Sequence, residues 1–353
     1  MFDCSKEITL FHNEKVALPQ LLRSDLRDKR DANRERLKSG LTAEEEPTPT
    51  GMWSQGSYAM HTMVQAEEND FDIDDGVYFK KDDLVDSNGF ELDPYLAKEM
   101  VRKAVNHHSL NTPPEIKDNC VRVHYEKGYH IDIPVYRTTS EDGKEFYELA
   151  SATSWKISDP RAVTEWFNES NKEQSPDETN GLQMRRVVKL LKDFVKSNTT
   201  HHEEGPSGFI ISKLVQEEYE PHLGRDDKSL YYTMRNIHDR LKDKSLEVDH
   251  PVVDEKLTAG EYDPTTTLFR TQLNSAMDEL QVLFETQYAG EALTAWGKVF
   301  KDQAYFSKQA SMQTQESASN SAHADDDSES SSIWVKSDEN VSPVDKKGGG
   351  RNA

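Results

Sequence analysis

Residues 71–80 read FDIDDGVYFK, and they set the expectation for the rest of the chain. Apolar residues before and after the aspartates predict a β-strand. Because side chains alternate across a strand, Asp72 and Asp74 project from one face, whereas Ile73 points into a core. Two carboxylates side by side repel each other, and each raises the pKa of the other unless a cation lies between them. Such oxygen ligands suit Mg²⁺, which also binds phosphates.

Two alternatives for this acidic stretch involve no catalytic metal. The first is a calcium-binding EF-hand loop, which requires Gly at its sixth position and Glu at its twelfth. Counted from Asp70, these positions hold Asp75 and Lys81, so the EF-hand is excluded. The second is a solvated acidic turn, which the stretch taken alone leaves open.

A hairpin predicted over residues 119–136, NCVRVHYEKGYHIDIPVY, supplies one more aspartate. Its second arm alternates, so Ile131 and Ile133 share an apolar face while Asp132 lies exposed on the polar face. Beside the strand at 71–80, Asp132 completes a set of three carboxylates that can hold two metal ions about 4 Å apart. An isolated aspartate in such a position is more often a surface residue than a metal ligand, so Asp132 gains its meaning from the strand at 71–80.

A short motif upstream offers contacts for phosphate. It reads Gln55-Gly56-Ser57 and lies about fifteen residues before Asp72. A Gly-Ser pair at a turn that opens a helix presents backbone N–H groups and a hydroxyl to phosphate oxygens. Gly-Ser pairs also occur in ordinary loops, so the motif gains meaning only beside the carboxylates.

A basic stripe follows the helix predicted over residues 182–197. Arg185, Lys189, Lys192 and Lys196 recur at spacings of four, three and four, which places them on one face. A solvated basic face is the common explanation for such a stripe. In a chain that is otherwise acidic, the stripe also provides the local cations that a triphosphate needs.

The remaining pattern predicts an α+β fold with a mixed sheet in the first half and a mainly helical second half. Two prolines in residues 44–51 end an N-terminal helix. Asp159-Pro160 is a typical helix start, with the aspartate as cap and proline in the first turn. We expect helices at 16–40, 93–108, 182–197, 207–219, 228–243 and 268–305.

Composition limits the classes of function. The chain has 353 residues, of which 34% are hydrophobic, and a formal net charge of −22. This charge argues against any obligatory nucleic acid partner and against anionic membranes. Cys4 and Cys120 form neither a disulfide framework nor a zinc site. With no signal peptide pattern and no apolar run near the ~18 residues of a membrane span, we expect a soluble, cytoplasmic protein.

Together these motifs resemble the polymerase-β-type nucleotidyltransferases, and more narrowly the bacterial cGAS/DncV-like nucleotidyltransferases. That family makes cyclic di- or trinucleotide second messengers in CBASS anti-phage defence. The resemblance covers roughly residues 50–300 and rests on the order of several segments. These are Gln55-Gly56-Ser57, Asp72–Gly76, His130–Tyr136, Ser158–Pro160, Glu165–Asn168, Arg185–Lys192, Gly205–Ser207 and Asp254–Lys256.

The resemblance implies a magnesium-dependent synthase that turns nucleoside triphosphates, ATP and GTP first, into a cyclic oligonucleotide such as cyclic GMP-AMP, with release of pyrophosphate. It implies two Mg²⁺ ions per site, with Mn²⁺ as a substitute. The implied catalytic and metal residues are Asp72, Asp74 and Asp132. The implied nucleotide-binding residues are Gln55, Gly56, Ser57, Ser158, Lys192, Ser207 and Asp254. One departure is Gly208, where the family pattern has a second serine, which leaves base preference open.

The resemblance also implies three parts: a polymerase-β-like catalytic lobe over residues 1–157 that includes the N-terminal helix, a helical lobe over 158–306, and a disordered tail over 307–353. The tail is rich in Ser, Gln, Asn, Asp and Ala, a composition that buries too little apolar surface to order itself. In many such systems a ubiquitin-transferase-like partner acts on the C-terminus. A solvated tail without a partner is the alternative.

Two other functions stay open at this point. One is a nucleotidyltransferase that modifies a protein or an RNA end, although the acidic charge disfavours RNA. The other is a non-catalytic nucleotide-binding scaffold, which the presence of all three carboxylates disfavours.

Overall fold

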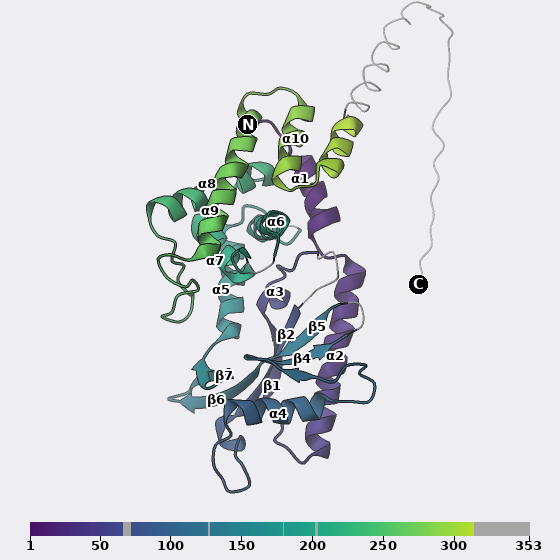
Figure 1. Cartoon of the computed structure of the whole chain (residues 1–353), viewed down its shortest axis with the longest axis vertical. Helices are drawn as coiled ribbons and strands as arrows, with labels where there is room; N and C mark the ends of the chain where they lie inside the picture. The colour runs from purple at the N-terminus through teal and green to yellow at the C-terminus, as the bar shows by residue number, and fades with distance from the viewer. Residues whose placement is uncertain (66–71, 126–127, 179, 202–203, 314–353) are drawn as a thin grey trace, which may run out of the picture. The chain divides into compact units, whose positions relative to one another are not determined.

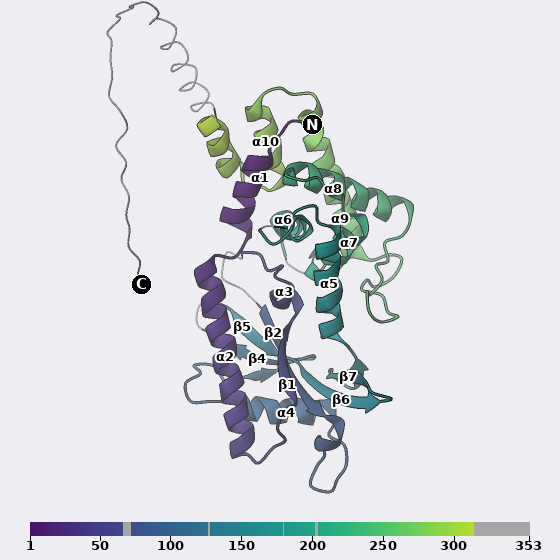
Figure 2. The ribbon, with the colours of Figure 1, turned by 180° about the vertical axis from the view of Figure 1, so that it is seen from behind.

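The computed structural model describes residues 1–65, 72–125, 128–178, 180–201 and 204–313. Two hydrophobic cores organise the residues up to Ala310 (Figures 1 and 2). One core lies on the sheet, and we call the elements around it the sheet lobe. The other lies among the helices of the second half, and we call these the helical lobe.

The sheet lobe contains a mixed sheet of eight strands. Its order is β3-β4-β5-β2-β6-β7-β8, and β1 pairs with β2 off this path. The strands are β1 (Gly51–Gln55), β2 (Asp72–Lys80), β3 (Glu115–Ile116), β4 (Val121–His124), β5 (His130–Ile133), β6 (Val135–Glu141), β7 (Lys144–Ala150) and β8 (Trp155–Ile157). The strand predicted at 71–80 is thus the centre of the sheet.

The single strand expected over 129–136 is divided in two at Pro134. Both halves, β5 and β6, pair with β2 in parallel, with Asp74 opposite Asp132 and Val77 opposite Val135. Proline has no N–H for the ladder, but its carbonyl accepts a hydrogen bond from the Val77 amide at 2.9 Å. The proline therefore marks the point where β2 changes partners.

Three α-helices and one 3₁₀ turn accompany the sheet. They are α2 (Gln20–Ala43), α3 (Gly56–Ala59), η2 (Lys81–Asp83) and α4 (Pro94–Val105). Leu26 and Leu37 of α2 and Val101 of α4 are buried against Ile73 in the sheet core. The helices expected at 16–40 and 93–108 are confirmed, with shifted ends.

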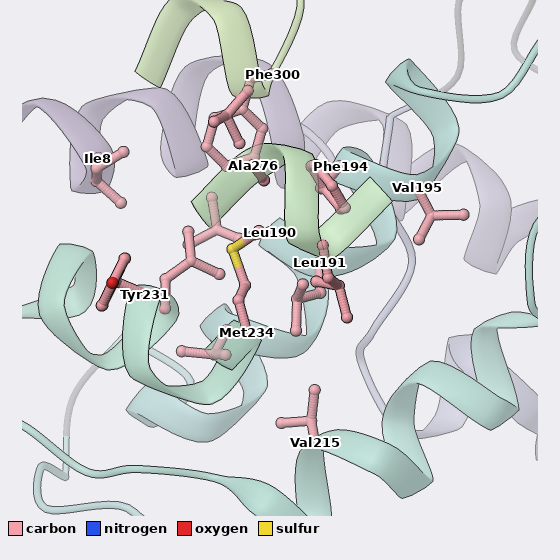
Figure 3. Close-up of a cluster of buried hydrophobic side chains, with 14 of the residues drawn as sticks. Ile8, Leu190, Leu191, Phe194, Val195, Val215, Tyr231, Met234, Ala276 and Phe300 are labelled. Carbon is pink, nitrogen blue, oxygen red and sulfur yellow. The ribbon is translucent and has the colours of Figure 1, made fainter. Parts of the chain in front are cut away.

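The helical lobe is built around α6. Its elements are α1 (Ser5–Phe11), the π-helical turn η1 (His12–Val16), α5 (Pro160–Gln174), α6 (Gln183–Ser197), α7 (Gly208–Glu218), α8 (Asp226–Asp243), α9 (Pro264–Leu280), the 3₁₀ turn η4 (Gln281–Phe284) and α10 (Ala289–Val299). Leu190, Leu191 and Phe194 of α6 face Met234 and the other helices in the core (Figure 3). As predicted, the Asp159 side chain caps α5 by accepting a hydrogen bond from the Ala162 amide at 3.0 Å.

The N-terminal residues pack with the helical lobe, not with the sheet lobe in which the domain prediction places them. Ile8 belongs to the helical core (Figure 3), as do Cys4 and Phe11. The Cys4 amide donates to Asp227 Oδ2 at 3.0 Å. Apolar residues in a short helix are buried wherever the fold leaves a matching surface, and the sequence pattern does not say where that surface is.

Two expectations near the C-terminus are wrong. The helix expected over 268–305 is interrupted by η4, because this turn carries the buried Leu283 into the core. Residues 303–313 are helical, so the disordered tail expected from 307 does not begin there. The rest of that tail, residues 314–353, lies outside the described residues. In the described part of the chain, no helix has the length and apolarity required to cross a bilayer.

Candidate active site

The predicted carboxylates meet on neighbouring strands. In the parallel register of β2 and β5, Asp72 lies opposite His130 and Asp74 lies opposite Asp132. One ligand atom each from Asp72, His130 and Asp132 lies within 4.8 Å of the others. We call Asp72, Asp74 and Asp132 the carboxylate cluster. The alternation of side chains along both strands thus correctly predicted that carboxylates 58 to 60 positions apart in sequence lie on the same face.

Two side chains that the sequence did not single out, His130 and Arg122, contact the carboxylate cluster. His130 forms an ion pair with Asp72. Arg122 of β4 lies opposite Asp132 and donates from Nε and Nη2 to the two carboxylate oxygens, each at 2.8 Å. Asp132 is 8% exposed, so the prediction that it lies exposed is wrong. The alternation along the strand correctly predicted the face of the sheet on which Asp132 lies, but β4 and Arg122 cover that face.

Asp74 has the unusual protonation behaviour in this cluster. Burial, followed by the charges of Asp132 and Asp72, raises the pKa of its carboxyl group to about 7. Arg122 and His130 lower this pKa but do not outweigh the other effects. Additional positive charge would therefore stabilise the ionised form of the carboxylate cluster, and a bound divalent cation supplies such a charge.

The Gln55-Gly56-Ser57 motif lies directly beside Asp74. Gln55 ends β1 opposite Asp74, and Gly56 begins α3 with φ of 62°. A Cβ atom on Gly56 would lie 2.3 Å from Asp74 Oδ2. The turn thus requires glycine both for its left-handed backbone and for its approach to the carboxylate. The Gln55 amide Nε2 donates to the hydroxyl of Tyr136 at 3.0 Å, which holds this side chain inside the sheet lobe.

We expect Gly56→Ala to lower the initial rate of pyrophosphate release by about 10²-fold, because it displaces Asp74 by a distance that matters for catalysis. Gly89→Ala is the matched control, since Gly89 also has positive φ, at 83°, but open space around its Cβ position. If both variants lose activity equally, backbone strain and not the approach to Asp74 is the cause.

The basic stripe of α6 is only partly the solvated face of the alternative explanation, because Lys196 is exposed whereas Lys189 is buried. Lys192 Nζ donates to the carbonyl oxygen of Thr62 at 3.2 Å and to its hydroxyl at 2.9 Å. Lys196 Nζ donates to the carbonyl oxygen of Gln65 at 2.8 Å. Burial and the charge of Lys189 lower the pKa of Lys192 to about 7. The stripe therefore faces the segment that follows α3.

The other predicted nucleotide-binding residues lie in different settings. Ser207 caps α7 by accepting a hydrogen bond from the Ile210 amide at 3.3 Å. A Cβ atom on the adjacent Gly208 would lie 2.9 Å from Lys192 Cε, so the glycine at this departure from the family pattern makes room for the lysine. Ser158 hydrogen-bonds Tyr136. Asp254 is exposed, and no contact among the described residues joins it to the carboxylate cluster.

Comparison with known proteins gives the same picture. Residues 50–136 match the family model of the nucleotidyltransferase domain of cyclic GMP-AMP synthase DncV-like proteins. A cyclic GMP-AMP synthase from Escherichia albertii is 28% identical over 213 residues, which are 58% of this chain and 45% of that protein. The chain spans about half the length of the curated relatives it matches.

Solved structures share the fold. Vibrio cholerae DncV in complex with a linear intermediate has a TM-score of 0.66 at 16% identity, with 86% of this chain and 97% of that chain covered. The Bradyrhizobium diazoefficiens protein CdnG in complex with GTP has a TM-score of 0.66 at 14% identity, with 89% and 100% covered. The predicted α+β, polymerase-β-like fold and the predicted family resemblance are confirmed.

Proposed function

We propose, on the premise that this chain is a cGAS/DncV-like nucleotidyltransferase, that it converts nucleoside triphosphates into a cyclic oligonucleotide and releases pyrophosphate. A cyclic dinucleotide such as cyclic GMP-AMP is the product we favour, and ATP and GTP are the substrates. Its role would be that of a second messenger in anti-phage defence.

The observation that carries the proposal is the carboxylate cluster in strand register, with the pKa of Asp74 raised to about 7. Asp72, Asp74 and Asp132 would hold two Mg²⁺ ions, or Mn²⁺ in their place. Such ions, when bound, activate an attacking hydroxyl and neutralise the charge that develops on the leaving pyrophosphate. Asp74 would release its proton to solvent before it serves as a ligand, and Arg122 would keep Asp132 oriented.

The residues around the cluster would position the substrate. Ser57 follows Gly56 in the first turn of α3, and we assign its hydroxyl to a phosphate oxygen of the substrate. The Lys192 ammonium group has three N–H donors, and Thr62 accepts two of them, so one remains for a phosphate oxygen. Gln55, Gly56, Ser158, Ser207 and Asp254 stay proposed nucleotide contacts on the strength of the resemblance.

Mass spectrometry of the products tests the proposal. Purified protein with Mg²⁺ and all four triphosphates should yield a small product that resists phosphatase, and chelation of the metal should abolish it. A labelled protein or RNA in place of the small product would favour end modification. Triphosphate binding by calorimetry with no release of pyrophosphate would favour the non-catalytic scaffold.

The cytoplasmic location and the ubiquitin-transferase-like partner remain proposals. The C-terminal residues on which such a partner would act lie within 314–353, outside the described residues.

A further inference from the structure

Three cationic side chains and one histidine gather where the segment of residues 61–65 runs along α6. We call Arg23, His61, Arg185 and Lys189 the basic cluster. No ion pair joins any of them to a carboxylate within the described ranges of the chain. Such a gathering is unexpected in a protein whose formal net charge is −22, so its positive charge calls for an explanation.

Hydrogen bonds to α6 fix how the segment runs along the helix. Lys196 binds the carbonyl oxygen of Gln65, and Lys192, one turn earlier, binds Thr62. The segment continues in this direction along α6, and one further turn toward the start of the helix places Lys189 beside His61. Arg185 precedes Lys189 by one further turn on the same face of α6, and its guanidinium group also donates to the Gly181 carbonyl oxygen at 3.0 Å and to Asn168 Oδ1 at 2.8 Å.

Arg23 approaches the same place from α2. Its Nε donates to the carbonyl oxygen of Leu18 at 3.0 Å, which folds the guanidinium group back toward the start of the helix. The neighbouring Ala17 forms a β-bridge with Val64 in the segment along α6. The sheet lobe and the helical lobe thus contribute cations to one location.

Some of the nitrogen atoms in this location have no partner among the described residues, although Arg185 Nη1 donates to the Gly181 carbonyl oxygen and Nη2 to Asn168 Oδ1. Lys189 is 7% exposed, and its ammonium group has no hydrogen bond or ion pair with any described residue. Arg185 Nε and His12 Nε2 are likewise buried without a partner in the described chain. The adjacent Arg186 is different, because Asp226 and Asp177 neutralise it. Burying an ammonium group without a counter-charge is costly, so Lys189 is prepared for an anion that the described residues do not supply.

Electrostatic effects within the cluster agree with this geometry. Burial, followed by the charges of Arg23, Arg185 and Arg186, lowers the pKa of Lys189 to about 8. Burial and the charges of Arg185, Lys189 and Arg23 lower the pKa of His61. Asp74 is shifted instead by Asp132, Asp72, Arg122 and His130. Burial and then the charge of Lys189 lower the pKa of Lys192, so the basic cluster adjoins the proposed phosphate contact at Lys192, while none of its members is among the charges that shift Asp74.

We propose that the basic cluster binds a phosphate-bearing anion at a site distinct from the carboxylate cluster. A phosphate group carries about two negative charges and several acceptor oxygens, which match one ammonium and two guanidinium groups that converge from α2 and α6. The ligand is either a free inorganic phosphate chain or the phosphates of a nucleotide. None of its residues belongs to the carboxylate cluster, but Lys189 lies one turn along α6 from the proposed phosphate contact Lys192, so the proposal rests in part on the proposed function.

Titration calorimetry in the presence of a chelator tests the site without the metal-dependent reaction. Inorganic tripolyphosphate and ATP are the two probes, at constant ionic strength. We expect the wild type to bind, and Lys189→Met to bind at least tenfold more weakly. Arg27→Gln is the matched control, because Arg27 is exposed one turn along α2 from Arg23, and it should bind as the wild type does. Equal affinity for both probes identifies a phosphate chain as the ligand, and tighter binding of ATP identifies a nucleotide.

Thermal unfolding is a second measurement, and it distinguishes phosphate binding by Lys189 from a purely structural role of this residue. Without phosphate, Lys189→Met should melt at the same temperature as the wild type or higher, because it removes an uncompensated charge. With tripolyphosphate, only the wild type and Arg27→Gln should gain in melting temperature.

Three results would overturn the proposal. These are no binding by the wild type, equal binding by Lys189→Met, or a large drop in the melting temperature of Lys189→Met in phosphate-free buffer. Binding that begins only after Glu67, Glu68 and Asp70 are changed to amides would also overturn it, since those carboxylates would then be the counter-charge.

Discussion

Asp74→Asn should lower the rate of pyrophosphate release by at least about 10²- to 10³-fold, the loss typical when one charged or polar group that stabilises a transition state is removed. The asparagine has the same shape but cannot supply the negative charge that holds a divalent cation between β2 and β5. Because Asp74 lies half-buried beside Asp72 and Asp132, the substitution also removes a repulsion within the fold. Activity should therefore be lost while the melting temperature stays equal or rises.

A coupled pyrophosphate assay and a thermal melt on the same samples measure both effects. Asp83→Asn is the control, because Asp83 is an exposed aspartate just beyond the same strand and should keep the wild-type rate. If Asp74→Asn retained more than a tenth of the wild-type rate, the assignment of the carboxylate cluster as the catalytic site would be wrong. A fall in melting temperature together with activity would point to a structural role for Asp74.

Arg186→Leu should have the largest effect on stability, about 3–5 kcal/mol in the free energy of unfolding. Arg186 is buried, and it donates from Nε to Asp226 Oδ2 at 2.6 Å and from Nη2 to Asp226 Oδ1 at 2.9 Å. It also forms an ion pair with Asp177 at 2.9 Å. Removing the guanidinium group leaves two carboxylates without their cation inside the helical lobe.

Urea denaturation at neutral pH measures this loss. The double variant Arg186→Leu with Asp226→Leu should recover a substantial part of it, because a buried apolar pair replaces a buried lone charge. Arg185→Leu is the neighbouring control on α6, since Arg185 has no carboxylate partner among the described residues. If Arg186→Leu cost no more than Arg185→Leu, the ion pairs of Arg186 would not be stabilising.

The strands and the carboxylate cluster could be predicted because a strand repeats every two residues. The alternation in 71–80 and 129–136 fixed the faces of Asp72, Asp74 and Asp132 without knowledge of the sheet. The same argument, applied to residues 119–125, would have placed Arg122 on the face of Asp132, and His130 stands two positions before that aspartate. Both residues could have been placed on this face from the sequence. Their contacts with the aspartates could not be predicted, because these depend on how β4, β5 and β2 pair.

Other features depend on long-range packing that no local pattern encodes. The stripe of α6 was visible in sequence, but its contact with Thr62 joins residues 130 positions apart. The burial of Asp132 also came from another strand. The placement of Ile8 among helices from the second half of the chain was likewise hidden, because an apolar helix face does not identify its partner.

The placement of the first sixteen residues has a mechanical consequence. The chain starts in the helical lobe, enters the sheet lobe as α2 begins at Gln20, and returns to the helical lobe after β8 at Pro160. Two bodies tied by a single tether can twist freely, whereas two bodies tied at two places can only swing about the line through both ties. Opening and closing around a substrate would then follow an axis through the ties near residues 17–19 and 158–159, and it would have to break the hydrogen bonds of Lys192 and Lys196 to residues 62–65 or carry that segment along.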